Sequence, residues 1–338
     1  MNKPLNIVLL SGGVGGAKMA EGFAFSQHAE MFSVIGNVAD DQAFHGLWVS
    51  PDIDTLTYTL AEEIDTDKGW GLKAETNQVL EQLKKLGSDT WMYLGDKDFA
   101  THIFRTELRK QGVRPSEIAA RIARSYGVKT PIILPTDSCI QNKVMTHSGW
   151  IDFQDYFVKY ACLPEILDFK IDGINEATAT PESLRAIAEA DLIVIAPSNP
   201  IVSIKPILSI PGMTEALLSS TAFKVAVSPL INGETVKGPA DHMMKVAGYR
   251  SDVLGVADVY NGLIDALVID QQDRNAVSEL SASVEHVLAT DTLMFNRQNK
   301  IRLAETLVHV YQAAKSKKRF SPPVSSHMSS DSGQQIAV

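Results

Sequence analysis

The chain has 338 residues, of which 45% are hydrophobic and 21% charged, and its formal net charge is -9. This length allows one large domain or two ordinary ones, and the acidic balance argues against a nucleic-acid partner because a negative surface repels the phosphate backbone. The 2 cysteines are too few for a disulfide framework or a zinc site, and no apolar run has the length of a membrane span. We therefore expect a cytoplasmic protein that binds neither nucleic acid nor membrane.

Short apolar runs alternate with amphipathic patterns along most of the chain. Strands are predicted at 5–10, 32–35, 132–134, 192–195, 224–227 and 266–269. Helices are predicted at 55–63, 77–86, 116–126, 181–190, 240–247 and 299–315. This alternation is typical of βαβ units, so the predicted fold class is α/β, with a Rossmann-like, mostly parallel sheet.

Two segments depart from this alternation. Residues 142–173 alternate between apolar and polar as in a hairpin, which predicts a smaller α+β subdomain inserted in a single domain of residues 1–315. Residues 316–338 are rich in Ser and Pro and lack periodicity, so we predict a disordered tail there.

The first predicted strand runs into a glycine-rich loop, IVLLSGGVGGAK at 7–18, that contains Gly12, Gly13, Gly15, Gly16 and Lys18. A dinucleotide-binding fingerprint needs a glycine where Lys18 stands, and a Walker A loop needs Gly-Lys-Ser/Thr, so neither motif fits. Glycines still let backbone N–H groups approach an anion, and a following helix adds its positive end. We predict a phosphate-binding loop; the alternative is a tight turn without a ligand.

Two later loops follow strands in the same way. Ser198 and Asn199 follow the strand at 192–195, and a segment that includes Lys237 follows the strand at 224–227. Each loop alone is also compatible with an ordinary turn, because Pro, Ser, Asn and Gly are the usual turn residues. Ligands bind beyond the carboxyl ends of strands in open α/β sheets, so the three loops together indicate a nucleotide site.

Paired carboxylates lie near these loops: Asp40 with Asp41, Asp52 with Asp54, and Asp96 with Asp98. Asp54 and Asp98 are each a plausible helix N-cap, but capping does not explain all three pairs. Carboxylates beside a phosphate-binding loop favour Mg²⁺, which shares its oxygen ligands with substrate phosphates. His102 and Arg105 share one predicted helix face, and we interpret them as surface residues that could also bind an anionic ligand.

Six segments in order carry a family resemblance: SGGVGGAK, ADDQAFHGLWVSPDIDT, LGDKDFATHIFRTEL, APSNPIVSIKPIL, AVSPLINGETVKGPAD and GVADVYNG. In these motifs the chain resembles the 2-phospho-L-lactate transferase family of deazaflavin coenzyme biosynthesis. The resemblance implies a Mg²⁺-dependent enzyme, usually a homodimer, that joins the deazaflavin Fo to a small phosphorylated acid activated as a guanosine diphosphate derivative. It also implies that the ribityl hydroxyl of Fo attacks the phosphorus that bears the acid, and that GMP leaves.

The resemblance assigns roles to individual residues. The guanosine phosphates would be held by the glycine loop with Lys18, by Ser198 and Asn199, and by Lys237. The metal would be held by Asp40, Asp41, Asp52 and Asp54. Asp52 and Asp54 would be the catalytic pair, and Asp54 and Tyr93 would face the deazaflavin.

Some segments differ from the family's usual pattern. Lys97 stands in GDKD where relatives commonly have GDRD, Lys205 stands in SIKPIL instead of SIGPIL, and TDSCIQ at 136–141 replaces MSDDPV. These differences leave phospholactate, phosphoenolpyruvate and phosphoglycerate derivatives open as donors.

Two other functions compete with the transferase. A non-catalytic, nucleotide-sugar-binding regulator of the gluconeogenesis-factor type shares the glycine loop, but Asp52, Asp54 and the GDKD segment argue against it. A dehydrogenase is disfavoured because the dinucleotide fingerprint fails.

Overall fold

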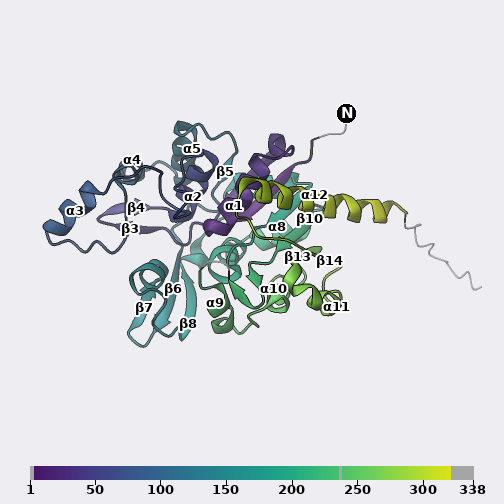
Figure 1. Ribbon diagram of the computed structural model, residues 1–338. Coiled ribbons are helices and arrows are strands. Elements are labelled where there is room, and N and C mark those ends of the chain that lie inside the picture. The colour runs from purple at the N-terminus through teal and green to yellow at the C-terminus, as the bar shows by residue number, and fades with distance from the viewer. Residues whose placement is uncertain (1–3, 236–237, 321–338) are drawn as a thin grey trace, which may run out of the picture.

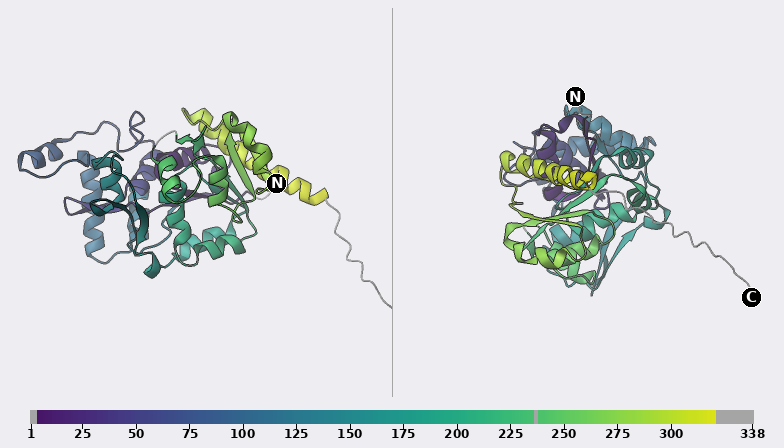
Figure 2. Two further views of the ribbon diagram at one scale, coloured as in Figure 1. Left: turned by 90° about the horizontal axis from the view of Figure 1, so that it is seen from below. Right: turned by 90° about the vertical axis from the view of Figure 1, so that its right-hand side faces the viewer.

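Seven parallel strands form the central sheet of the computed structural model, which describes residues 4–235 and 238–320 (Figures 1 and 2). In sheet order they are β14 (His286–Thr290), β13 (Ala266–Asp270), β10 (Phe223–Val227), β9 (Leu192–Ile195), β1 (Ile7–Ser11), β2 (Phe32–Gly36) and β5 (Ile132–Ile133). Ile7, Val8, Leu9 and Leu10 are fully buried, as expected for a parallel sheet covered on both faces. The predicted Rossmann-like α/β class is confirmed.

The helices between the strands mostly follow the predicted pattern, but their ends differ. Their bounds are α1 (Gly13–Ala24), α2 (Pro51–Leu60), α3 (Gln78–Lys85), α4 (Asp96–Lys110), α5 (Pro115–Ser125), α6 (Pro181–Glu189), α7 (Lys205–Ser209), α8 (Met213–Ser219), α9 (Ala240–Val246), α10 (Val253–Val259), α11 (Val277–Leu280) and α12 (Arg297–Phe320). Short helical turns lie at Ala29–Met31, Asp155–Lys159, Ile174–Glu176, Pro200–Ile204 and Gln271–Ala276.

Three predictions of local structure are wrong. Asp54 and Asp98 do not cap helices, because α2 already begins at Pro51 and α4 at Asp96, which places both carboxylates inside the first helical turns. Helix α12 continues to Phe320, so the first residues of the predicted disordered tail are helical. The remainder of that tail, 321–338, lies outside the described residues.

Two insertions flank the sheet. Between β2 and β5 the chain forms an arm from the hairpin β3 (Gln42–Phe44) and β4 (Leu47–Val49) with α3 and α4, seen at the left of Figure 1. Between β5 and β9 it forms an antiparallel sheet of β7 (Gly149–Asp152), β6 (Gln141–Thr146) and β8 (Asp168–Asp172), which occupies the segment predicted as the inserted subdomain. A small hairpin, β11 (Leu230–Ile231) and β12 (Glu234–Thr235), follows β10.

The order of the strands creates a crevice. From β1 the chain adds β2 and β5 on one side of the sheet, and later adds β9, β10, β13 and β14 on the other. The order therefore reverses between β1 and β9, where the loops after the two strands diverge. Among the described residues no single helix is long and apolar enough to cross a membrane, and one bent pair, Pro200–Ser209 with Met213–Ser219, meets that test by length and composition alone.

A buried acid joins the two ends of the described chain. Glu21 of α1 is 7% exposed, and its carboxylate accepts a hydrogen bond of 3.1 Å from Arg297 Nε and a shorter one from Lys300 Nζ. Arg297 also reaches the exposed Glu62, at 2.7 Å. The added Cβ of an alanine at Gly22 would lie 2.4 Å from the carbonyl oxygen of Lys300, so α1 and α12 are in close contact.

We predict that Glu21→Gln lowers the free energy of unfolding by about 2 kcal/mol, because Lys300 is left partly buried without a counter-charge. Glu62→Gln is the matched control, since it removes an exposed partner of the same arginine and is expected to cost less than about 0.5 kcal/mol. Urea unfolding of the three proteins measures both values. Equal losses in the two variants would contradict the role of burial.

Candidate active site

One cavity of about 550 Å³ lies at the carboxyl ends of β1 and β9, where the strand order reverses. All three predicted strand-end loops line it: the glycine loop after β1, the loop after β9, and residues that follow β10. The arm and the segment 292–294 close its other sides. Lys18 is among the lining residues and Lys205 is not, while Lys237 lies outside the described residues.

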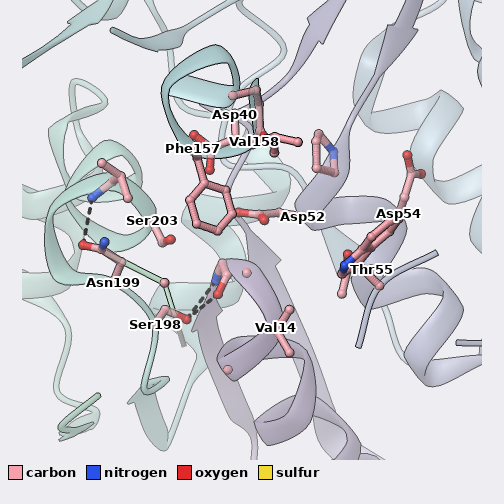
Figure 3. Close-up of a pocket in the computed structure, with 18 of the residues that line it drawn as sticks. Val14, Asp40, Asp52, Asp54, Thr55, Phe157, Val158, Ser198, Asn199 and Ser203 are labelled. Atoms are coloured by element: carbon pink, nitrogen blue, oxygen red, sulfur yellow. Dashed lines mark hydrogen bonds between the residues drawn. The ribbon is translucent and has the colours of Figure 1, made fainter. Parts of the chain in front are cut away.

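The glycines of the first loop allow close packing around the start of α1. Gly13 has φ +63°, a conformation that side chains disfavour, and an added Cβ at Gly15 would lie 2.4 Å from the carbonyl oxygen of Pro197. Ser198 joins the two loops, because its Oγ accepts from the Gly12 N–H at 3.1 Å and donates to the Gly12 carbonyl at 2.6 Å (Figure 3). Ser198 thus holds the glycine loop in place.

The side-chain amide of Asn199 forms hydrogen bonds through its oxygen but not through its nitrogen. Its Oδ1 accepts from the N–H groups of Ile201 at 3.0 Å and Val202 at 3.3 Å and so caps the following helical turn. Its Nδ2 is buried and has no hydrogen-bond partner among the described residues. Buried donors are normally paired, so this N–H group is available to an acceptor in the cavity.

Asp40 and Asp52 both line the cavity and share a neighbour, Asn37 (Figure 3). Asn37 Nδ2 lies 3.0 Å from Asp52 Oδ2 and 3.5 Å from Asp40 Oδ2, while Asn142 Nδ2 donates to Asp40 Oδ1 at 2.7 Å. Burial raises the pKa of Asp52 to about 6, and burial together with the charge of Asp52 raises the pKa of Asp40 well above its usual range. The pair therefore favours a proton or a cation.

The other two predicted metal ligands point elsewhere. Asp41 accepts hydrogen bonds from Ser50 Oγ at 2.6 Å and Trp48 Nε1 at 3.1 Å and lines a separate, much smaller cavity. Asp54 lies apart from Asp52 in Figure 3 and is paired with Arg105. In the described parts of the chain, no three His, Cys, Asp or Glu side chains are grouped as a metal site. The four predicted ligands therefore do not form one cluster.

The interpretation of His102 and Arg105 as surface residues is wrong. They are 2% and 4% exposed, because the face of α4 that carries them packs beside α2 and the cavity. Arg105 binds Asp54 through both terminal nitrogens, with Nη1 at 3.1 Å from Oδ2 and Nη2 closer to Oδ1. Arg105 Nη1 also lies 3.0 Å from His102 Nδ1, and burial lowers the pKa of His102 to about 4.

Asp96 and Asp98, the third predicted pair, have different surroundings. Asp96 is half-buried and accepts from Thr76 Oγ1 and from the N–H groups at the start of α3. Asp98 lines the cavity, and burial, followed by the charge of Asp54, raises its pKa to about 7.

Aromatic side chains form the wall of the cavity on the side of the arm. Tyr93, which was predicted to face the ligand, lies there. Its ring is edge-on to that of Trp70, with 5.8 Å between the ring centroids. Phe157 enters from the short helix beside β7 (Figure 3). Its ring stacks on that of Phe153, with 5.9 Å between the ring centroids. The complete aromatic lining also includes Tyr58 and Trp91. Sequence reasoning missed all of these except Tyr93, although aromatic residues clustered at 91–93 are a visible pattern.

Comparison with known proteins identifies the family. A sequence model described as "2-phospho-L-lactate transferase CofD" matches residues 7–308. The 2-phospho-L-lactate transferase of Methanococcoides burtonii is 36% identical over 90% of this chain and 99% of that protein. That of Methanocaldococcus jannaschii is 36% identical over 89% of this chain and 97% of that protein. This chain belongs to the 2-phospho-L-lactate transferase family. It is thus a transferase, as predicted.

Solved structures agree with the fold of this family member. Two crystal structures of one Bacillus halodurans protein, a member of the UPF0052 family, superimpose with TM-scores of 0.60 and 0.58. They are 18% and 16% identical in sequence, cover 90% and 91% of this chain, and are themselves covered completely. At this identity the likeness extends to the fold alone.

The depressed pKa of His102 makes stability depend on pH. Between pH 6.5 and about 4 the unfolded chain protonates this histidine and the folded chain does not, so the free energy of unfolding falls as pH falls. We predict that wild type loses about 2 kcal/mol more than His102→Gln between pH 7 and pH 5. Urea unfolding at both pH values measures the difference, and parallel losses in the two proteins would show that His102 is not the neutral group inferred.

Proposed function

We propose that this transferase joins the phospho-acid moiety of a guanosine-diphosphate-activated small acid to the ribityl hydroxyl of the deazaflavin Fo, with release of GMP. The main support is the cavity of about 550 Å³, whose lining includes the start of α1 and the unpaired Asn199 N–H group as well as an aromatic wall. This chain also matches almost the whole length of relatives named 2-phospho-L-lactate transferase. Phospholactate is therefore the first donor to test, before phosphoenolpyruvate and phosphoglycerate.

The donor is assigned to the end of the cavity between β1 and β9. The first residues of α1, from Gly13 to Gly15, line this space, so the positive end of the helix dipole lies beside it. Lys18 adds a positive charge to the lining, and Asn199 Nδ2 adds the buried N–H group. These groups suit a diphosphate, whose oxygens accept hydrogen bonds and carry negative charge.

The acceptor is assigned to the aromatic end. Fo carries a flat ring system, and Tyr93, Trp70 and Trp91 offer large apolar surfaces on which such a ring can stack. Asp98 and His102 place polar groups on the same side of the cavity. Between the two ends lies the Asp40–Asp52 pair, where the hydroxyl of one substrate would meet the phosphorus of the other.

Asp40 and Asp52 alone are better placed to hold a Mg²⁺ ion than all four aspartates predicted from the sequence. Both are buried, face the cavity and have raised pKa values, so a cation there would offset the cost of their mutual repulsion. Two carboxylates suffice, because Mg²⁺ usually takes its other ligands from water and substrate phosphates. When bound, the ion would neutralise negative charge on the diphosphate. Asp54 is unsuited to this role because its charge is matched by Arg105.

The reaction needs placement and charge neutralisation more than a covalent nucleophile. The ribityl oxygen forms a bond to the phosphorus that bears the acid, the bond from that phosphorus to the GMP oxygen breaks, and the hydroxyl proton is released. The loop held by Ser198 orients the phosphates, and the aromatic wall orients the acceptor. The buried position of the carboxylates limits competition by water.

We predict that Asp52→Asn lowers kcat by roughly a thousandfold and abolishes stimulation by added Mg²⁺, because half of the carboxylate pair is lost. Asp41→Asn is the control: it makes the same substitution at another buried aspartate, which lines the other cavity, and it should retain activity within a few-fold. The assay follows the phosphodiester product and GMP by chromatography with mass spectrometry.

The same assay decides between the competing functions. Absence of product from Fo with any of the three activated acids, together with absence of Fo binding, would exclude the proposed transfer. Tight binding of a nucleotide sugar without turnover would instead favour the regulator of the gluconeogenesis-factor type.

A further inference from the structure

His102 is a buried side chain to which the proposed reaction assigns no specific contact. It lines the cavity, is 2% exposed, and lies on the face of α4 that also carries Asp98. One ring nitrogen, Nδ1, is 3.0 Å from Arg105 Nη1. The other, Nε2, has no hydrogen-bond partner among the described residues. A ring nitrogen on the wall of the cavity that makes no hydrogen bond within the protein is available to a group on the ligand.

The contact with Arg105 determines which nitrogen of the ring carries the proton. A guanidinium has N–H donors and no acceptor, so Nδ1 must accept the hydrogen bond and Nε2 must carry the hydrogen of the neutral ring. The alternative, an Nδ1–H group that donates to Asp54, is not supported, since Nδ1 and Asp54 Oδ2 are 3.8 Å apart. Asp54 in turn fixes Arg105 through two hydrogen bonds.

We propose that His102 Nε2–H donates a hydrogen bond to a ring carbonyl oxygen of the heterocycle bound in this cavity, and that Arg105 is the positioning residue that fixes this tautomer. The carboxyl group of Asp98, one helical turn away on the same face of α4, is placed to pair with an N–H group next to that carbonyl. The chemistry recognised is the edge of a cyclic amide, where C=O and N–H alternate.

Two substrates of the proposed function carry such an edge: the pyrimidinedione ring of Fo and the guanine base of the donor. The identity of these two ligands rests on the proposed function. The tautomer of His102 does not, because it follows from the contact with Arg105 in the protein alone. The aromatic side chains near His102 favour the larger ring system of Fo.

The first test reads the tautomer without any ligand. In protein labelled with ¹⁵N-histidine, the pair of ring signals that disappears in His102→Gln belongs to His102. We expect an unprotonated Nδ1 and a protonated Nε2. In the double variant Asp54→Leu/Arg105→Met, which removes the ion pair without leaving a lone charge, the preference for this tautomer should be lost. A protonated Nδ1 in wild type would overturn the proposal whether or not the enzyme transfers anything to Fo.

The second test uses a matched pair of variants. His102→Asn keeps an acceptor near Nδ1 for Arg105 but lacks the donor into the cavity, whereas His102→Gln keeps a donor near Nε2. We expect His102→Asn to raise the KM for one substrate about tenfold with kcat little changed, and His102→Gln to restore most of the lost affinity relative to His102→Asn. His147→Asn is the control, since that histidine is exposed and lies outside the cavity.

Each outcome is decisive. A higher KM and a weaker fluorescence-titrated affinity for Fo assign the interaction to the acceptor, and a higher KM for the activated phospholactate assigns it to guanine. Unchanged values for both ligands, or equal damage in His102→Asn and His102→Gln, would overturn the role of the N–H group. If wild type transfers nothing to Fo, the proposed function fails, while the tautomer measurement still tests the role of Arg105.

Discussion

The buried ion pair between Asp54 and Arg105 is the interaction on which the side of the cavity next to the arm depends. It joins α2, which packs beside the sheet, to α4, which belongs to the arm. Removal of one partner from such a pair typically costs about 3–5 kcal/mol, because the other charge is left in a medium that solvates it poorly. The same arginine holds His102 in one orientation, so the position of the arm and the polarity of the cavity are set by one contact.

The glycine-loop side of the cavity depends on a different constraint, which is the reversal of strand order between β1 and β9. The reversal makes two adjacent loops diverge, and the hydrogen bonds between Ser198 and Gly12 prevent them from separating further. The glycine at position 15 follows from the same closeness, because a side chain there would collide with the backbone of Pro197. The loop that we propose to bind phosphate thus matches neither of the two common glycine motifs. It combines a helix N-terminus with a neighbouring loop that leaves no room for a Cβ at Gly15.

Much of the sheet is predictable from sequence because parallel strands covered on both faces are continuous apolar runs, as at Leu9 and Val194. Strand β14 was not predicted, since it lies at the edge of the sheet and its residues are only partly buried. The loops of the cavity could be identified because each follows such a run. The burial of His102 and Arg105 could not, because their partner Asp54 is about fifty residues away and a helix face shows only polarity, not what it packs against.

The four aspartates predicted to bind the metal also show that sequence spacing alone does not reveal what a side chain contacts. Asp52 and Asp54 are two residues apart in α2, and residues with this spacing point to different sides of a helix. Asp52 therefore faces Asn37 and the glycine loop, while Asp54 faces α4. Two carboxylates that look alike in the sequence differ in what compensates their charge: an arginine already neutralises Asp54, whereas Asp40 and Asp52 repel each other until a proton or cation arrives. Substitution of Asp54 thus acts first on the packing of the arm, and substitution of Asp52 first on the ligand, although the two changes are chemically identical.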